Sequence, residues 1–180
     1  FTITCSTSLF LLAIIHSQKN SVAFFAATEL ISGVIWLIPG TVYNSFRSKV
    51  GYLTQSSSRL YKLQKLLNQI NPISFLCGIF TCTTIIICSK SLLANFGKAY
   101  LIAQPSLIIL TVGAFIGLLS QASVIILAFS GYEKLLLKIV ILELLILLFV
   151  SIPSIYFCGI IGASLSLSIT IVVKGDITTF

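Results

Sequence analysis

Residues 135–173 read LLLKIVILELLILLFVSIPSIYFCGIIGASLSLSITIVV, and this stretch decides the fold class. A helix that crosses a bilayer needs about 20 mostly apolar residues. The run is about twice that length, which is too long for one helix across one bilayer. Pro153 and the GIIG sequence at 159–162 are the signals for a break inside it. We therefore expect two helices, at 135–155 and 156–173, joined as a tight hairpin.

The composition of the whole chain also points to a membrane. Hydrophobic residues make up 57% of the 180 residues and charged residues only 8%, against roughly a quarter charged in a soluble domain. A soluble globule still exposes much of its area to water, and four acids with eleven bases cannot cover it. Lipid tails are the solvent that such a surface needs, so we expect an integral membrane protein.

Four further apolar runs, at 1–16, 21–46, 72–89 and 105–130, have the character of membrane spans. With the hairpin they predict about six transmembrane helices, the first of them cut short, in an all-α polytopic membrane helix bundle. The chain begins at Phe1 and contains no methionine. We therefore expect it to be a piece of a longer protein, within which 1–180 forms a single membrane domain.

Basic residues are distributed unevenly between the two ends of the predicted spans. One side holds Arg47, Lys49, Arg59, Lys62, Lys65, Lys134, Lys138 and Lys174, and the other holds Lys19, Lys90 and Lys98. Cytoplasmic loops carry the excess of lysine and arginine in membrane proteins. The bias places the loop 47–71 and the C-terminus in the cytoplasm.

The basic loop 47–71 has a helical pattern of its own. Leu60, Leu63, Leu67 and Ile70 recur at helical spacing, with three bases on a neighbouring strip. Such a segment fits a short helix at the level of the lipid headgroups. It equally fits an extension of the following span into the cytoplasm, and both interpretations stay open.

The sequence contains none of the patterns that hydrolytic or transfer enzymes use. There is no P-loop, no G-x-S-x-G, no HExxH and no closely spaced pair of acids. The five cysteines lie in apolar segments without CxxC spacing, and one histidine offers no zinc site. The bases are not interleaved with stacking aromatics. We expect no enzyme activity, no cofactor, no metal and no nucleic-acid partner.

Two acids, Glu29 and Glu143, lie inside predicted spans. An ionised carboxylate in lipid costs several kcal/mol, so such residues usually face a partner or a water-filled cavity. We consider both as sites for a coupling ion, H⁺ or Na⁺. Glu29 alternatively reaches the headgroups or pairs with Lys19, and either acid, if protonated, could donate a hydrogen bond to a neighbouring helix. The glycines of G-x-x-x-G, Gly113 and Gly117, predict close helix packing.

Four short motifs occur in a familiar order along the chain. They are VAFFAA at 22–27, FGKAYLIA at 96–103 followed by Leu107 and Ile109-Leu110, LAFSGYEK at 127–134, and Ile152-Pro153 followed by GIIGAS at 159–164. Together they resemble the C-terminal half of an O-antigen or polysaccharide flippase, of the superfamily that includes multidrug antiporters. Ala23 and Phe25 replace an expected glycine and tyrosine, and 45–49 lacks the proline that relatives often carry.

The resemblance implies one lobe of a two-lobe transporter in the bacterial cytoplasmic membrane. Such a protein moves an undecaprenyl-diphosphate-linked oligosaccharide between leaflets, in contact with membrane lipids and with other polysaccharide-assembly proteins as potential partners. Arg47 and Lys49 are then candidates for attracting the diphosphate, although ordinary positive-inside residues would look the same. The alternatives are a multidrug or metabolite cation antiporter of the same superfamily and a membrane enzyme of polysaccharide assembly.

Overall fold

The computed structural model describes residues 2–15, 19–53, 59–129 and 133–179, and all of these are helical except residues 95–97. The elements are α1 (Thr2–Ile15), α2 (Lys19–Leu53), α3 (Arg59–Ala94), the 3-10 helix η1 (Lys98–Ala103), α4 (Gln104–Phe129) and α5 (Glu133–Thr179). The predicted all-α class is confirmed for this part of the chain.

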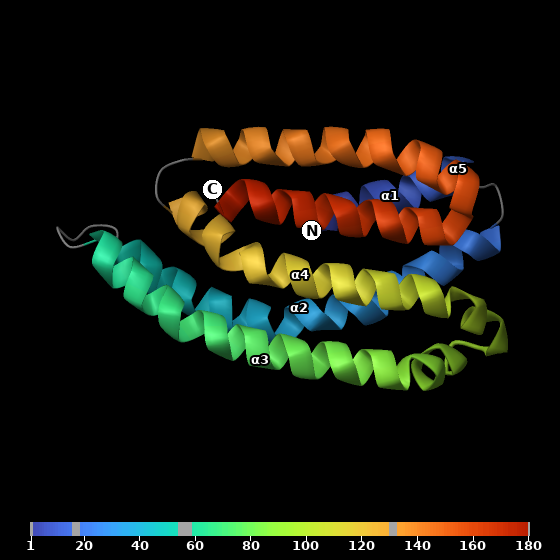
Figure 1. The fold of residues 1–180 in the computed structure, drawn as a ribbon, viewed down its shortest axis with the longest axis horizontal. Coiled ribbons are helices and arrows are strands. Elements are labelled where there is room, and N and C mark those ends of the chain that lie inside the picture. Colours follow the sequence, from blue (N-terminus) through green and yellow to red (C-terminus); the bar gives the residue numbers. More distant parts are fainter. Residues whose placement is uncertain (1, 16–18, 54–58, 130–132, 180) are drawn as a thin grey trace.

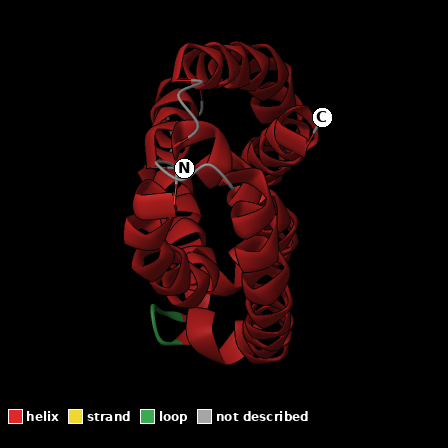
Figure 2. Ribbon diagram, turned by 90° about the vertical axis from the view of Figure 1, so that its left-hand side faces the viewer, coloured by secondary structure: helices red, strands yellow, loops and turns green. Residues whose placement is uncertain are grey.

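The helices run along one common long axis, with successive ones antiparallel (Figure 1). α4 is central, since it packs against α5 on one side and against α2 and α3 on the other, whereas α1 packs against α5 and α2. Two apolar clusters hold this arrangement together, one around Phe25, Leu110 and Leu167 and the other around Ile35, Leu107 and Leu118. Viewed from one end, the helices form an elongated bundle (Figure 2).

Four of the described helices contain a stretch that is long and apolar enough to cross a membrane: Asn20–Leu37, Pro72–Ala94, Lys98–Gln121 and Lys134–Gly175. Large apolar side chains cover the outside of the bundle, with Ile87, Phe149 and Phe157 at least three-quarters exposed. Water-soluble monomers rarely expose apolar surface on this scale. The lengths and the surface together indicate a membrane-embedded bundle.

α5 is a helical hairpin, as the sequence predicts. The chain reverses at Gly159, where φ is 55° and ψ is −123° (Figure 1). The break lies at this glycine and not at 155–156, and Pro153 stays inside the first arm. Beyond the turn, Gly162 lies so close to the Ser154 carbonyl group that no side chain fits there. Further along, the Ser151 hydroxyl donates a hydrogen bond of 2.9 Å to Ser166 Oγ.

The segment expected as a loop at 47–71 is helical wherever the structure describes it. α2 continues to Leu53, and α3 begins at Arg59 and runs without a break through Pro72. Of the two interpretations left open by the sequence, this supports an extension of the following span. Proline marks no boundary here, because the helix accommodates it with the loss of one backbone hydrogen bond.

The contact between α4 and the second arm of α5 depends on small residues. Gly113 lies directly against Ser168, and Gly117 lies directly against Ile171 with Trp36 of α2 beside it. The Ser168 hydroxyl also donates a hydrogen bond of 3.1 Å to the Ile109 carbonyl oxygen. The close packing predicted from G-x-x-x-G is therefore present, and it brings the backbones of α4 and α5 together.

The turn conformation predicts that Gly159→Ala lowers stability. A Cβ atom is strained at a positive φ of 55°, and such conformations cost about 1–3 kcal/mol outside glycine. Gly33→Ala is the matched control, because a Cβ atom there meets nothing within 4 Å. Thermal unfolding in detergent should occur at a lower temperature for Gly159→Ala and at an unchanged or higher one for Gly33→Ala. Equal unfolding temperatures for both variants and the parent would contradict the turn.

Candidate functional site

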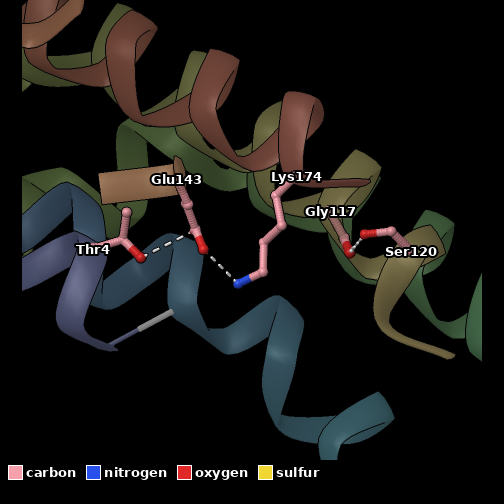
Figure 3. A network of polar contacts seen from close by, with 5 residues as sticks. All are labelled: Thr4, Gly117, Ser120, Glu143 and Lys174. Atoms are coloured by element: carbon pink, nitrogen blue, oxygen red, sulfur yellow. Dashed lines mark hydrogen bonds and ion pairs between the residues drawn. The ribbon is translucent and has the colours of Figure 1, made fainter. Parts of the chain in front are cut away.

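Glu143 lies on the first arm of α5 and is 5% exposed. Its Oε2 atom lies 2.8 Å from Lys174 Nζ on the second arm, and its Oε1 atom accepts a hydrogen bond of 3.2 Å from Thr4 Oγ1 on α1. Figure 3 shows the carboxylate between these two partners. Both carboxylate oxygens of Glu143 therefore have a partner, and the three residues connect α1 with both arms of α5.

The ion pair removes the main objection to a charged residue at this depth. A buried carboxylate without a partner is strongly unfavourable, whereas an ion pair with additional hydrogen bonds is tolerated. The Lys174 side chain is 20% exposed and that of Glu143 is 4% exposed. The Lys174 side chain is thus the more accessible of the two to water.

Sequence reasoning identified Glu143 but not its partner, since Lys174 was counted only as a cytoplasmic base. The signal lies in the register of the hairpin. Ser151 contacts Ser166 across the two arms. Eight residues further from the turn on each arm, slightly more than two helical turns, Glu143 on the first arm lies opposite Lys174 on the second. The pairing could be derived only once the position of the turn was known.

Glu29 lies on α2 in a different polar environment. The Cys5 thiol of α1 forms a hydrogen bond with its carboxyl group. The other carboxyl oxygen, Oε2, is buried and has no hydrogen-bond partner in the described part of the chain. The predicted alternative of pairing with Lys19 involves a side chain outside the described residues. The Glu29 carboxyl group thus has one weak hydrogen-bond donor, the Cys5 thiol, and its Oε2 atom has none among the described residues.

Glu29 and Glu143 lie on different helices, but both contact the same turn of α1. Thr4 contacts Glu143, and the next residue, Cys5, contacts Glu29. Thr4 and Cys5 are both almost fully buried, as is Ser8 one turn further on. The Ser8 hydroxyl has no hydrogen-bond partner among the described residues. The result is a polar cluster formed by α1, α2 and α5, in which Glu143 is buried and Glu29 is partly buried. We call it the α1 polar cluster.

The two predicted diphosphate-binding bases remain a prediction. Arg47 and Lys49 belong to the last part of α2, and their side chains lie outside the described residues. Within the described ranges, no group of histidine, cysteine, aspartate and glutamate side chains has an arrangement that could hold a metal ion.

Hydroxyl groups satisfy one another elsewhere in the interior. Ser106 on α4 and Ser164 on α5 form a hydrogen bond between their side chains, and Gln104 Nε2 donates to Ser89 Oγ on α3 at 3.2 Å. These bonds join neighbouring helices, as polar side chains do in membrane bundles. They account for Ser89, Ser106 and Ser164 as packing residues. The α1 polar cluster contains both membrane-span acids and is the candidate site.

No protein-family model matches the chain, and neither a curated protein nor a solved structure matches it. The motifs and the geometry of the α1 polar cluster are therefore the features of the chain that bear on its function.

The ion pair predicts a specific pattern of stabilities. Glu143→Gln leaves the Lys174 ammonium without its counter-charge, and breaking a buried pair on one side costs about 3 kcal/mol. Adding Lys174→Met removes that charge as well, so the double variant should recover most of the loss. Thermal unfolding in detergent measures both effects. The single variant Lys174→Met completes the comparison. If the loss of stability in the double variant equalled the sum of the losses in the two single variants, the two residues would not act as a pair.

Proposed function

We propose that this chain is one lobe of a flippase that moves a lipid-linked oligosaccharide across the bacterial cytoplasmic membrane. The α1 polar cluster is the observation that supports transport. Two acids and a lysine lie among helices that are otherwise apolar, and ionisable groups at such positions characteristically belong to solute or ion pathways. The ordered motifs at 22–27, 96–103, 127–134 and 159–164 support this particular cargo.

The backbone conformations of two motif glycines support the resemblance. Within the described residues, Gly97 (φ 127°) and Gly159 (φ 55°) are the only residues with a positive φ. Each occupies a glycine position of a quoted motif, one after α3 and the other at the turn of α5. These conformations favour glycine, so the motifs coincide with the chain reversals that shape the bundle.

The arrangement of the helix ends supports the proposed orientation. The ends of α2 and α4, the beginnings of α3 and α5 and the C-terminus lie at one end of the bundle, and η1 and the turn within α5 lie at the other (Figure 1). The basic residues divide in the same way, with eight at the first end and three at the second by their positions in the sequence. We assign the end rich in bases to the cytoplasm, where Arg47 and Lys49 would meet the diphosphate of the cargo.

The proposed transport couples movement of the cargo to binding of an ion. A sugar and a diphosphate cannot cross hydrocarbon unaided, so a second lobe would complete a wet cavity with alternating access. In that scheme Glu29 or Glu143 binds the coupling ion, H⁺ or Na⁺. The α1 polar cluster lies where α1 meets both α2 and the α5 hairpin, so ion binding there would act on three helices at once.

The proposal predicts a stranded intermediate when the full gene is deleted. Lipid-linked repeat units should accumulate on the cytoplasmic leaflet, and the surface glycan that contains them should be lost. Leaflet-specific labelling of lipid-linked sugars in membrane vesicles measures this, with the complemented strain as control. Unchanged surface glycan without a stranded intermediate would contradict a flippase. Loss of resistance to cationic dyes instead would favour the multidrug antiporter.

The orientation predicts which residues a membrane-impermeant thiol reagent reaches in intact cells. In a background without the native cysteines, Asn95→Cys, beside η1, should be labelled from outside. Ser57→Cys, between α2 and α3, should be labelled only after the membrane is opened. The reverse pattern would invert the proposed topology while leaving the fold unaffected.

A further inference from the structure

The two carboxyl groups of the α1 polar cluster are neutralised to different extents. Glu143 has an ammonium at 2.8 Å and a hydroxyl donor at 3.2 Å. Glu29 has the Cys5 thiol on one side and a buried Oε2 without a hydrogen-bond partner among the described residues. The first arrangement suits an ionised carboxylate, and the second does not.

We propose that Glu29 is the exchangeable proton site of this lobe and is neutral in the arrangement seen here, whereas Glu143 is held in its ion pair with Lys174. The proposal rests on the proposed transport function and makes it more specific, because it assigns the coupling ion and separates the roles of the two acids. The proton adds to the Glu29 carboxylate to give the acid, with no other bond changed. Glu143 is excluded as the exchanging group because Lys174 already neutralises it.

A proton fits the surroundings of Glu29 better than a sodium ion does. A hard cation requires several oxygen ligands around it. The side chain that contacts the Glu29 carboxyl group is a thiol, which is a soft ligand that suits other metals. A carboxylic acid, by contrast, needs no ligand shell, and protonation removes the charge that the apolar span disfavours.

The charged and titratable groups around Glu29 are few. α1 contributes Cys5, and α5 contributes the Glu143–Lys174 pair, which is neutral as a unit. α3 carries Cys82 and Lys90, and η1 carries Lys98 and Tyr100. α4 has no charged or titratable residue in its sequence. Among the described side chains, none of these lysines forms an ion pair with Glu29, and a proton would neutralise the carboxylate without such a partner.

Proton release would act on α1 directly. Loss of the proton leaves a carboxylate oxygen without a donor inside the bundle, which is costly until a donor or water reaches it. Cys5, which contacts this carboxyl group, is adjacent to Thr4, which holds Glu143. A movement of α1 that separates Cys5 from Glu29 would therefore also weaken the hydrogen bond between Thr4 and Glu143 of the α5 hairpin.

Labelling with dicyclohexylcarbodiimide tests the proposal, because this apolar reagent attacks protonated carboxyl groups within membranes. The full protein in membrane vesicles is treated at a series of pH values, and the modified residues are identified by mass spectrometry. We expect Glu29 to be modified, and the rate to fall by about tenfold per pH unit once the group ionises. Glu143, the matched acid in the same cluster, should stay unmodified.

Two controls make the result decisive. Glu29→Gln, which imitates the neutral acid and should fold normally, must abolish the labelling at this position. Replacing choline by sodium at constant pH and ionic strength should leave the rate unchanged. Absence of labelling at Glu29, a rate independent of pH, or protection by sodium would each overturn the proton site. Because labelling needs no cargo, it can succeed or fail independently of the gene-deletion experiment.

Discussion

Charge neutralisation in an apolar environment is the constraint on which this structure depends. The Glu143 carboxylate and the Lys174 ammonium neutralise each other at 2.8 Å, and this contact helps to fix the two arms of α5 in one register. The hydrogen bond from Thr4 then attaches α1 to the same pair. Nearer the turn, the close approach of Gly162 to the Ser154 carbonyl group and the Ser151–Ser166 hydrogen bond hold the same register.

Much of the fold follows from the sequence because length and apolar composition directly limit what can cross a bilayer. The hairpin at 135–173 was predicted on that basis, and G-x-x-x-G correctly indicated the close contact at Gly113. The helices continue through most of 47–71 for a physical reason. Polar and basic residues keep a helix out of hydrocarbon but do not prevent it from continuing into water, so composition marked the ends of the spans and not the ends of α2 and α3.

The candidate site was predictable only in part. Glu29 and Glu143 stand out in the sequence because acids are rare in apolar spans. Their convergence on Thr4 and Cys5 did not follow, because it depends on how α1 packs between α2 and α5. Lys174 near the end of a span is indistinguishable in sequence from an ordinary cytoplasmic base. The partner of a buried charge is a property of the tertiary register, which local patterns do not contain.

The long apolar run folds back at Gly159 into two arms in a defined register. Disulfide cross-linking of Ser151→Cys with Ser166→Cys, in native membranes and in a background without native cysteines, measures this register. The hydroxyl oxygens of these residues lie 2.9 Å apart, so rapid disulfide formation is expected. Ser151→Cys with Ile169→Cys, whose second position is exposed on the outer face, should not cross-link. No bond in the first pair, or equal bonding in both, would contradict the hairpin.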